Sequence, residues 1–446
     1  MSITALTFLL LYLGGLGAAL VRHPLFGVYA YMLAFYMDAP HRWWGASLPD
    51  LRWSFLAALV TLVSVLRFPR QADRARWYAT GIGKILIGYM LWMWIQSIWA
   101  ISPSTHLDGC LLITKYVILF AILYETLSDE TSIVNFLLAH VAGCFYLGFL
   151  AWQAPVSGRL EGIGGPGIDD ANSLAMHLSS GLVTASFLFL ILRGFRKWAV
   201  IVAIPFILNG VILTESRGAL VSLGGTGMFL VLLKPKAYAK VFYLAGGLAL
   251  VLLVYLSNGQ YWSRMQTLET VTGSETELHS SMAGRVLIFQ ANMSMFRDHP
   301  LGVGYRGNVA LSRHYMPEGL MSNIGVRSAH NSMAAALVDH GIIGGMLYAA
   351  MMFWTVRALL SLKRLDRYGL PANVGGLRAG VGGGLVVAFF AGLFSNFLFA
   401  EVQIWLLAVL ASVCSAFIPQ YEACSNNSQA VDAGMCFMVI PKGWRR

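Results

Sequence analysis

The sequence predicts an all-α, polytopic integral membrane protein. Of its 446 residues, 57% are hydrophobic and only 12% are charged, and the mean hydropathy is +0.65. A soluble core of this size cannot bury so much apolar surface. Apolar runs long enough to cross a hydrocarbon layer about 30 Å thick recur at residues 82–100, 173–192, 241–256 and 381–399. They must be helices, because lipid offers no partner for an open backbone and the alternating pattern of a barrel does not occur.

The start of the chain leaves two arrangements open. The first apolar run, residues 3–20, leads directly into further apolar sequence without a convincing small-residue cleavage site, which favours a retained helix over a removed signal peptide. Pro24 separates it from a shorter run, residues 25–37. One crossing here gives about 12 transmembrane helices in total, with a range of about 11–13, and two crossings give about 13. We expect the first arrangement.

Lysine and arginine gather between the apolar runs. A net charge of +10 would suggest nucleic acid as the partner of a soluble protein, but here the positive-inside rule accounts for it. The clusters predicted to be cytoplasmic, together with the C-terminus, are Arg67/Arg70/Arg74/Arg76, Arg193/Arg196/Lys197, Lys234/Lys236/Lys240, Lys363/Arg364/Arg367 and Lys442/Arg445/Arg446. The opposite face, which is the periplasm in a Gram-negative host, then receives residues 101–107, 153–172, 215–218, 258–327 and 400–402.

Spans and loops divide the chain into four predicted parts. These are N-terminal transmembrane helices (1–257), one large periplasmic loop subdomain that contains helices (258–327), C-terminal transmembrane helices (328–419) and a cytoplasmic tail (420–446). The loop is too long for an ordinary connection. It contains arginines but no lysine, which suggests planar, multidentate contacts with an anion. A solvated charged surface is the alternative, because five acidic residues accompany the arginines.

The cysteines suggest no covalent or metal framework. The chain has five of them, with no CxxC motif and no evident Cys/His metal spacing, and none lies in the long loop. Neither a disulfide framework nor a metal site is therefore predicted.

His330 and Asn331 stand at the start of an apolar segment, RSAHNSMAAALVDHGIIGG, and so at the mouth of a helix that enters the membrane. Histidine titrates near neutral pH, so His330 can act as a general base toward a hydroxyl group, with Asn331 helping to orient it. The alternative is a His-Asn cap that is tied to the backbone of the helix.

Two arginines lie at predicted outer junctions. Arg217, in TESRGALV, lies where two closely spaced spans meet, and an uncompensated guanidinium there is costly unless it is paired or functional. It can hold an anion, or it can snorkel to the interface. Arg159 opens the outer loop GRLEGIGGPGIDDANSLA, whose glycines allow backbone amides to approach a ligand, although an ordinary turn explains them as well.

Arg285 begins a helical stretch of the long loop, AGRVLIFQANMSMFRDHPLGVGYRG. It shares one helical face with Phe289, and Ile288 shares a face with Met295, so this helix can lie on the membrane surface. Guanidinium groups and an imidazole that face one compartment suit a substrate with a large anionic group and a reacting hydroxyl.

These motifs carry a family resemblance. The order SRG, then GR before a helix, then hPLGVG, then HN before a helix with G(I/L)IG resembles the O-antigen ligase and polymerase superfamily, called WaaL or Wzy_C, over roughly residues 159–345. The stretch HPLFGVYAYMLAFYMDAPHRWW is also similar to a subgroup of O-glycosylation ligases found beside exosortase systems. The resemblance implies a GT-C-like glycosyltransferase of the bacterial inner (cytoplasmic) membrane, with its active site facing the periplasm and with no cofactor or metal.

The resemblance also implies roles for individual residues. His330 matches the histidine of the HN motif, which activates the acceptor hydroxyl. Arg217 matches the arginine of SRG and Arg285 the one that opens the loop helix, and both engage the pyrophosphate of the donor. Arg159 is a looser match in the outer loop, and Asp339 stands where many relatives have glutamate and receives no role. The expected supporting residues are Asn331, Arg327 and Arg306.

The function expected from this resemblance is that of an O-antigen ligase. Such an enzyme transfers a preassembled glycan from undecaprenyl diphosphate to a sugar hydroxyl of lipid A-core, with His330 as general base and with inversion at the anomeric carbon. The arginines take the place of a divalent metal, in agreement with the lack of a DxD motif. The expected partners are the lipid-linked donor, the lipid A-core acceptor and membrane lipid, and not nucleic acid. A lateral cavity is expected for these lipids, lined by Trp43, Trp44, Trp53 and Trp262 unless they anchor the interface.

Other functions remain open. An O-antigen polymerase would use the same residues but transfer to another lipid-linked glycan, and a protein O-oligosaccharyltransferase would transfer to serine or threonine. A polysaccharide or lipid transporter, from a different class, would also explain the spans and a basic cavity. It predicts charged residues near the middle of the membrane and weak internal symmetry, whereas the charges here collect at one face.

Overall fold

The computed structural model describes residues 1–68, 74–154, 158–256, 282–317, 321 and 325–425, and every regular element within those ranges is a helix. The all-α prediction is therefore confirmed for this part of the chain. Eight of the described helices are long and apolar enough to cross a membrane. They are α1 (Ile3–Val21), α5 (Pro103–Thr126), α6 (Glu130–Gln153), α7 (Ala171–Ile191), α8 (Phe195–Leu213), α15 (Ser332–Arg364), α16 (Ala372–Ala391) and α17 (Glu401–Ser425).

The other helices are shorter or lie in loops. They are α2 (Leu25–Met37), α3 (Trp53–Arg67), α4 (Gly81–Gln96), α9 (Arg217–Leu233), α10 (Ala239–Leu256), α13 (Met282–Asp298) and α14 (Gly307–Tyr315), with 3₁₀ turns at Ala39–His41, Trp43–Ser47, Trp77–Ala79, Lys236–Tyr238 and Leu365–Tyr368. Helix α2 has 13 residues, which span about 20 Å at 1.5 Å per residue and fall short of the hydrocarbon layer. The expected total of about 12 spans therefore stays a prediction. Helix α17 continues to Ser425, past the predicted start of the tail at residue 420.

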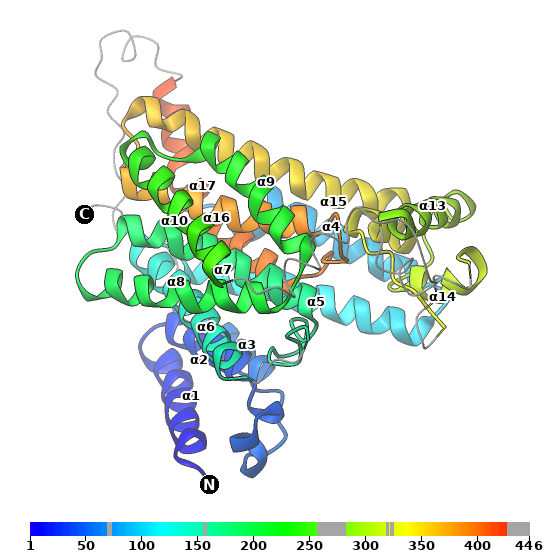
Figure 1. Cartoon of the computed structure of the whole chain (residues 1–446), viewed down its shortest axis with the longest axis horizontal. Coiled ribbons are helices and arrows are strands. Elements are labelled where there is room, and N and C mark those ends of the chain that lie inside the picture. Colours follow the sequence, from blue (N-terminus) through cyan, green and yellow to red (C-terminus); the bar gives the residue numbers. More distant parts are fainter. Residues whose placement is uncertain (69–73, 155–157, 257–281, 318–320, 322–324, 426–446) are drawn as a thin grey trace.

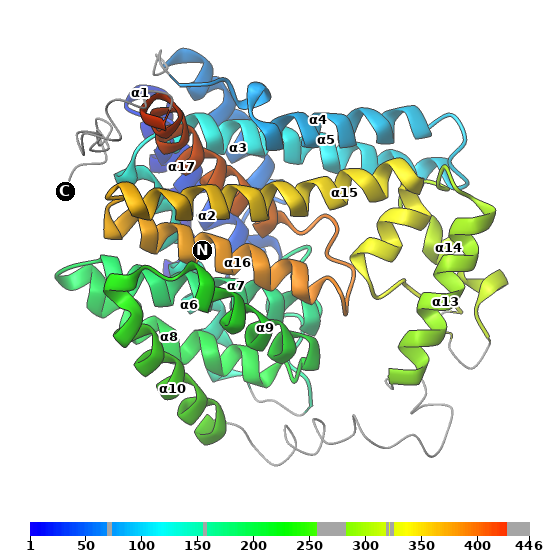
Figure 2. The same cartoon turned by 90° about the horizontal axis from the view of Figure 1, so that it is seen from above.

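The long helices lie together as one bundle, with α13 and α14 at one end of it (Figure 1 and Figure 2). Helix α16 forms the centre, because it packs against α7, α9, α15 and α17 and most of its residues are buried. Helices α1, α2 and α3 pack on one another, and one hydrophobic cluster extends from α1 to α17. The described spans therefore form a single packed body.

Helix α16 differs from the predicted apolar run 381–399. It begins at Ala372 and ends at Ala391, and residues 392–400 form an irregular turn. Arg378 interrupts the apolar sequence in the first half of the helix, so the predicted apolar run begins only at residue 381. Its fully buried guanidinium pairs with Asp366 at 2.7 Å and donates hydrogen bonds to carbonyl oxygens at the ends of α9 and α15. The charge is thus paired within the protein, and the helix can pass through the centre of the bundle.

Helix α15 is interrupted at Gly341, where φ is 67° and ψ is −167°. The carbonyl oxygens of residues 338, 339 and 340 accept hydrogen bonds from Val303 N, Gly304 N and Trp92 Nε1, at 3.2, 2.8 and 2.7 Å. The donors Val303 and Gly304 belong to the motif hPLGVG, residues 299–304. Main-chain groups inside a membrane need hydrogen-bond partners. The turn 299–304 therefore supplies hydrogen bonds that α15 lacks where it is interrupted.

Helix α13 has the predicted position but a different environment. Ile288 and Met295 are buried in a cluster with Val303, Met316 and Val338. The face that they share therefore packs against protein. Phe289, which shares the other predicted face with Arg285, is exposed, so a position of this helix on the membrane surface stays a prediction.

Two of the tryptophans expected to line a lateral cavity lie in the core. Trp44 and Trp53 are buried, and their rings pack against Phe8 and, for Trp53, also against Tyr12. The expectation is therefore wrong for these two residues, whose role is packing between α1 and α3. Trp43 is exposed, and Trp262 lies outside the described residues.

Candidate active site

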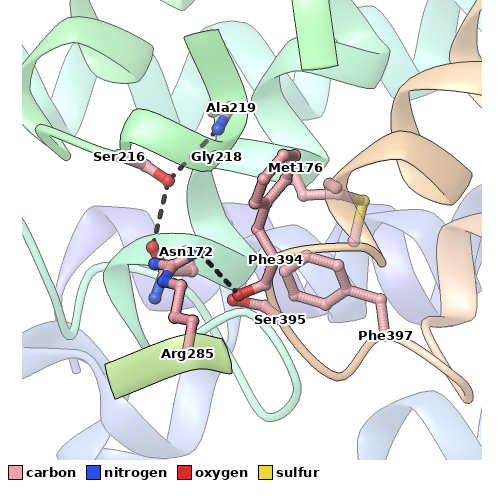
Figure 3. A pocket seen from close by; sticks show the side chains of 10 residues that line it. Asn172, Met176, Ser216, Gly218, Ala219, Arg285, Phe394, Ser395 and Phe397 are labelled. Carbon is pink, nitrogen blue, oxygen red and sulfur yellow. Dashed lines mark hydrogen bonds between the residues drawn. The ribbon is translucent and has the colours of Figure 1, made fainter. Parts of the chain in front are cut away.

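The first residues of α7 and α9 face the turn 392–400, which also touches the start of α15 (Figure 3). With Arg285 of α13 they enclose a cavity of about 240 Å³. It is lined by Asn172, Met176, Ser216, Gly218, Ala219, Arg285, Ala391, Phe394, Ser395 and Phe397. A helix N-terminus presents unpaired N–H groups and the positive end of the helix dipole. Two such termini at one cavity favour an anionic ligand.

The turn 392–400 fixes the start of α15 through Ser332. Ser332 N donates to Gly392 O at 2.7 Å, and Ser332 Oγ donates to Ser395 O at 3.2 Å. The same hydroxyl oxygen accepts from Phe397 N at 2.8 Å. The residue that follows the HN motif is therefore held by both ends of the turn.

Asn331 is the N-cap of α15. Its Oδ1 accepts from Ala334 N at 2.9 Å, and its Nδ2 donates to Leu393 O at 3.3 Å. The cap interpretation of the His-Asn pair is therefore right for Asn331. The amide fixes the helix end that carries His330 and does not bond to the imidazole. His330 itself is half-buried, with φ at 49°.

The guanidinium groups of Arg159, Arg285 and Arg327 lie close enough to interact. Burial, followed by the charges of Arg327 and Arg159, lowers the pKa of Arg285, and burial lowers the pKa of Arg327. Arg285 also donates from Nη1 to Phe394 O at 3.5 Å, with its guanidinium 5.8 Å from the centre of the Phe394 ring. Like charges gathered in a half-buried site are stabilised when an anion binds among them.

Arg159 joins the outer loop to the helix ends at this site. Its Nε donates to Thr214 O at 3.2 Å, and its Nη2 donates to Asn172 Oδ1 at 3.1 Å. Ser216 Oγ donates to the same oxygen of Asn172 at 3.0 Å. Arg159 therefore fixes the starts of α7 and α9 relative to each other, besides contributing charge.

The two remaining predicted arginines differ in position. Arg217 is the first residue of α9 and is half-buried, and the residues on either side of it line the cavity. Arg306 is exposed, and its guanidinium lies 6.0 Å from the centre of the Tyr305 ring. Its backbone N–H donates to Asp339 Oδ2 at 3.2 Å, while Asn308 N donates to Asp339 Oδ1 at 2.8 Å. Asp339 thus fixes the start of α14, and Arg306 is not brought to the other arginines.

The pKa of His330 is lowered from 6.5 to about 4. Burial is the largest cause, and the charges of Arg327 and Arg285 add to it, whereas Asp170 opposes the shift. The imidazole is therefore neutral at neutral pH, with one ring nitrogen able to accept a proton. A proton acceptor and an anion-binding group of arginines thus lie beside each other.

Sequence reasoning missed several residues of this site, namely Asn172, Ser216, Ser332 and Phe394. One signal was readable. Asp170 accepts hydrogen bonds from Asn172 N and Ser173 N and caps α7, and an aspartate just before an apolar helical run is a usual mark of a helix start.

A further group was also overlooked. Among the residues that the structure describes, His140, Cys144 and His177 offer ligand atoms within 4.8 Å of one another. The four-residue spacing of His140 and Cys144 puts both on one helical face. This group belongs to α6 and α7 and not to the arginine cluster, and it is the one with the geometry of a metal site in the described ranges.

Comparison with known families agrees with the motifs. Residues 202–349 match the family model described as O-antigen ligase. The matched segment includes Arg217, Arg285, Arg327 and His330 but not Arg159. A comparison with curated proteins found no match. Members of the matched family are glycosyltransferase-like enzymes that act on lipid-linked polysaccharides in membranes. Residues 202–349 of this multi-pass membrane protein are therefore similar to the O-antigen ligase family.

Proposed function

We propose that the chain is an O-antigen ligase, which transfers a preassembled O-antigen polysaccharide from undecaprenyl diphosphate to lipid A-core at the periplasmic face of the inner membrane. The observation that supports this most is the convergence of Arg159, Arg285 and Arg327 beside a neutral His330, at a cavity formed by helix N-termini. The donor supplies the anion, and the acceptor supplies the hydroxyl.

The arginines bind the diphosphate of the donor. Their planar guanidinium groups can each donate two hydrogen bonds to phosphate oxygens. The start of α9 adds the positive end of a helix dipole, whereas Asn172 N and Ser173 N at the start of α7 already bond to Asp170. Because undecaprenyl diphosphate leaves as an anion, this positive environment stabilises the negative charge that develops as the glycosidic bond breaks.

His330 accepts the proton of the acceptor hydroxyl. The hydroxyl oxygen forms a bond to the anomeric carbon, the bond from that carbon to the phosphate oxygen breaks, and its electron pair leaves with undecaprenyl diphosphate. The anomeric configuration inverts, because the nucleophile attacks from the face opposite the leaving group. General-base assistance of this kind contributes about 10² to 10⁴ in rate.

Donor binding also activates His330. The charges of Arg327 and Arg285 contribute to the low pKa of the imidazole. A diphosphate bound by these arginines offsets their charges, so the pKa of His330 rises when the donor is present. The base is therefore strongest when both substrates can react.

The cavity accommodates only the reacting groups. The space of about 240 Å³ between its lining residues includes the part that is open to solvent, so it is far too small for a polyprenyl chain or a polysaccharide. The polyprenyl chain and the polysaccharide must therefore extend beyond it, the first into lipid and the second into the aqueous phase.

A transfer assay with purified full-length protein tests the proposal. Lipid-linked glycan and lipid A-core are supplied with excess EDTA, and we expect transfer by the wild type. His330→Ala and Arg285→Ala should each lose about 10² or more in rate. The matched controls are His314→Ala on α14 and Arg297→Ala on α13, whose side chains are exposed, and both should keep wild-type rates. Full activity in His330→Ala would exclude its role as base.

The acceptor is tested in parallel reactions. Lipid A-core, a second lipid-linked glycan and a serine- or threonine-containing peptide are offered separately to the same preparation. Transfer only to lipid A-core supports the ligase. Transfer only to the second glycan would identify a polymerase, and transfer only to the peptide a protein O-oligosaccharyltransferase, in each case with the same dependence on His330.

A further inference from the structure

A second cluster of chemically reactive side chains lies inside the bundle. His140 and Cys144 are one turn apart on α6, His177 is on α7, and Tyr36 is near the end of α2. All four side chains are buried, with exposed fractions of 3% or less. One atom from each of His140, Cys144 and His177 lies within 4.8 Å of the others. Three helices thus bring ligand-type side chains to one point.

Tyr36 completes this cluster to four donor atoms. Its Oη lies 2.6 Å from His140 Nδ1, 2.8 Å from His177 Nε2 and 3.7 Å from Cys144 Sγ. Cys144 Sγ lies 3.9 Å from His140 Nδ1. In a tetrahedral zinc site with bonds of about 2.0–2.3 Å, the ligand atoms are roughly 3.3–3.8 Å apart. Shifts of about 1 Å or less, within the reach of side-chain rotation, convert the observed arrangement into that tetrahedron.

Hydrogen bonds alone leave this cluster incompletely satisfied. The Tyr36 hydroxyl can donate a hydrogen bond to one imidazole and accept one from the other. His140 Nε2 is buried and has no hydrogen-bond partner among the described residues. A buried polar atom without a partner is unfavourable, so the hydrogen bonds within the cluster do not satisfy all of its polar atoms.

A divalent ion suits both the donor set and the surroundings. Zn²⁺ accepts imidazole nitrogen, thiolate sulfur and phenolate oxygen together, because it is a borderline ion. Binding would release the protons of Cys144 and Tyr36, and the two resulting negative charges balance the ion. A neutral complex is the form that a low-dielectric interior tolerates best.

The neighbouring residues leave room for these four side chains. A Cβ at Gly181 would lie 2.4 Å from Cys144 Sγ, and a Cβ at Gly143 would lie 2.1 Å from the ring of Tyr36. Trp405 covers the imidazoles, with its ring centre 5.8 Å from that of His140 and 5.8 Å from that of His177. His177 also lines a cavity of about 300 Å³ together with Glu401, which offers an entry path for the ion.

We propose that His140, Cys144, His177 and Tyr36 bind one Zn²⁺ in a closed, structural site. Four protein ligands leave no open position for substrate, which distinguishes structural from catalytic zinc. The ion would join α2, α6 and α7, and the first turn of α7, which begins at Ala171, places Asn172 at the candidate active site. The zinc therefore stabilises α7, whose Asn172 accepts a hydrogen bond from Arg159. It takes no part in glycosyl transfer.

The metal content of purified protein tests this site directly. The full chain is purified with an affinity tag that contains no histidine, exposed to Zn²⁺ and desalted, and zinc is measured by mass spectrometry. We expect about one zinc per chain in the wild type and a loss of at least tenfold in Cys144→Ser and His177→Gln. In Tyr36→Phe the dissociation constant should rise about 10- to 100-fold; an unchanged constant would overturn the four-ligand site.

The chain contains a matched control for these variants. His106 and Cys110 have the same spacing on α5, with His106 Nε2 3.4 Å from Cys110 Sγ, and both are buried. They belong to no metal-type group in the described part of the chain. Cys110→Ser should therefore keep its zinc. Equal zinc in Cys144→Ser and the wild type, or no zinc in the wild type, would overturn the proposal.

Cobalt substitution separates loss of metal from loss of fold. Co²⁺ in the wild type should give a thiolate-to-cobalt charge-transfer band, which Cys110→Ser keeps and Cys144→Ser loses at equal thermal stability in chelator. A wild-type spectrum without that band would overturn the assignment of Cys144. Because these readouts do not use glycosyl transfer, their outcome is independent of the proposed ligase activity.

Discussion

His330 adopts the left-handed backbone conformation, with φ at 49°, which is uncommon outside glycine but is taken more often by Asn, Asp and His than by other residues. Such a conformation costs on the order of 1–3 kcal/mol and persists only where neighbours impose it. The neighbours here are the Asn331 cap and the Ser332 contacts to the turn 392–400. The imidazole position is thus set by its backbone more than by a hydrogen bond to the ring.

The pH dependence of activity follows from the charges around His330. Its pKa in the free protein is about 4, and a base works only when deprotonated, so kcat/KM should hold constant as pH falls from 8 to about 5 and decline near pH 4. The acidic limb of kcat should lie at higher pH, because bound diphosphate offsets the arginines. Arg327→Ala should move the kcat/KM limb upward.

Steady-state rates measured between about pH 4 and 8 check this prediction. His314→Ala serves as the control, since that exposed histidine should leave both limbs in place. A wild-type kcat/KM limb near the ordinary histidine pKa of about 6.5 would contradict the burial and the arginine effect together.

Arg285 is expected to favour function at the expense of stability. Burial and the neighbouring charges of Arg327 and Arg159 lower its pKa, so its charged form is unfavourable when no anion is bound. Arg285→Ala should therefore leave the Tm of the free protein unchanged or raise it, while donor-dependent stabilisation is lost. Thermal unfolding with and without lipid-linked donor measures both. A clear drop in the Tm of the donor-free variant would show that Arg285 is mainly structural.

At the scale of elements, the break in α15 explains the motif hPLGVG. A Cβ at Gly341 would lie 2.3 Å from Leu301 C, and a Cβ at Gly302 would lie 2.3 Å from Gly341 N. Ile342 N donates to Pro300 O at 2.9 Å, and Gln96 Nε2 donates to Leu301 O at 3.0 Å. Two glycines with positive φ thus let the turn and the helix exchange main-chain hydrogen bonds at close range.

Gly341→Ala should therefore be far more damaging than an ordinary glycine substitution. It adds a backbone collision to the conformational cost of a positive φ, which alone is about 1–2 kcal/mol. Gly369→Ala is the matched control, because Gly369 has φ at 80° with open space around its Cβ position. We expect folded yield in detergent to collapse for the first and to fall only modestly for the second. Similar yields would contradict the close packing of the turn.

The sequence indicated most of the helices but not the ends that form the site. Hydropathy located α4, α7 and α10, which overlap the apolar runs 82–100, 173–192 and 241–256. It misplaced α16, since the charge of Arg378 is visible in the sequence while its partner Asp366 and the carbonyls of α9 and α15 are not. The sequence of residues 392–400 is largely apolar, like that of the helix before it. Only its contacts to Ser332 explain why the helix ends there.

The site residues also divide into those that the sequence indicates and those that only the packing of the helices explains. Arg285 and His330 were predictable, because a charged or titratable residue beside an apolar helix start is unusual in the sequence itself. Asn172 and the His140–Cys144–His177 group were not, because their significance depends on which helices pack together. For Asn331 the sequence left two roles open, and the hydrogen bond from Ala334 N to its Oδ1 shows that it is the cap.

At the scale of the whole molecule, the basic clusters between the helices and the candidate site lie at opposite ends of the helices. Helices α7, α9 and α15 start at the candidate site and end next to Arg193, Lys234 and Lys363. Helix α16 runs the other way, from the basic end to the turn 392–400. The positive-inside rule then assigns the basic end to the cytoplasm and the site to the outer face.

Cysteine labelling tests this orientation. In a variant without native cysteines, Glu161→Cys should react with a membrane-impermeant maleimide in intact spheroplasts, and Arg193→Cys should react only after permeabilisation. Both side chains are exposed, so accessibility is limited by the membrane and not by packing. The opposite pattern would reverse the topology and place the arginine cluster in the cytoplasm.

The contacts between the start of α15 and residues 392–400 also determine the stage of synthesis at which the candidate site is complete. Arg159 and Arg285 are synthesised before α15. The start of α15 acquires its partners Gly392 and Ser395 only after α16 has followed it into the membrane. Every shorter nascent chain lacks the contacts that fix His330. Under the proposed function, we therefore expect transfer activity only after the last helices have inserted.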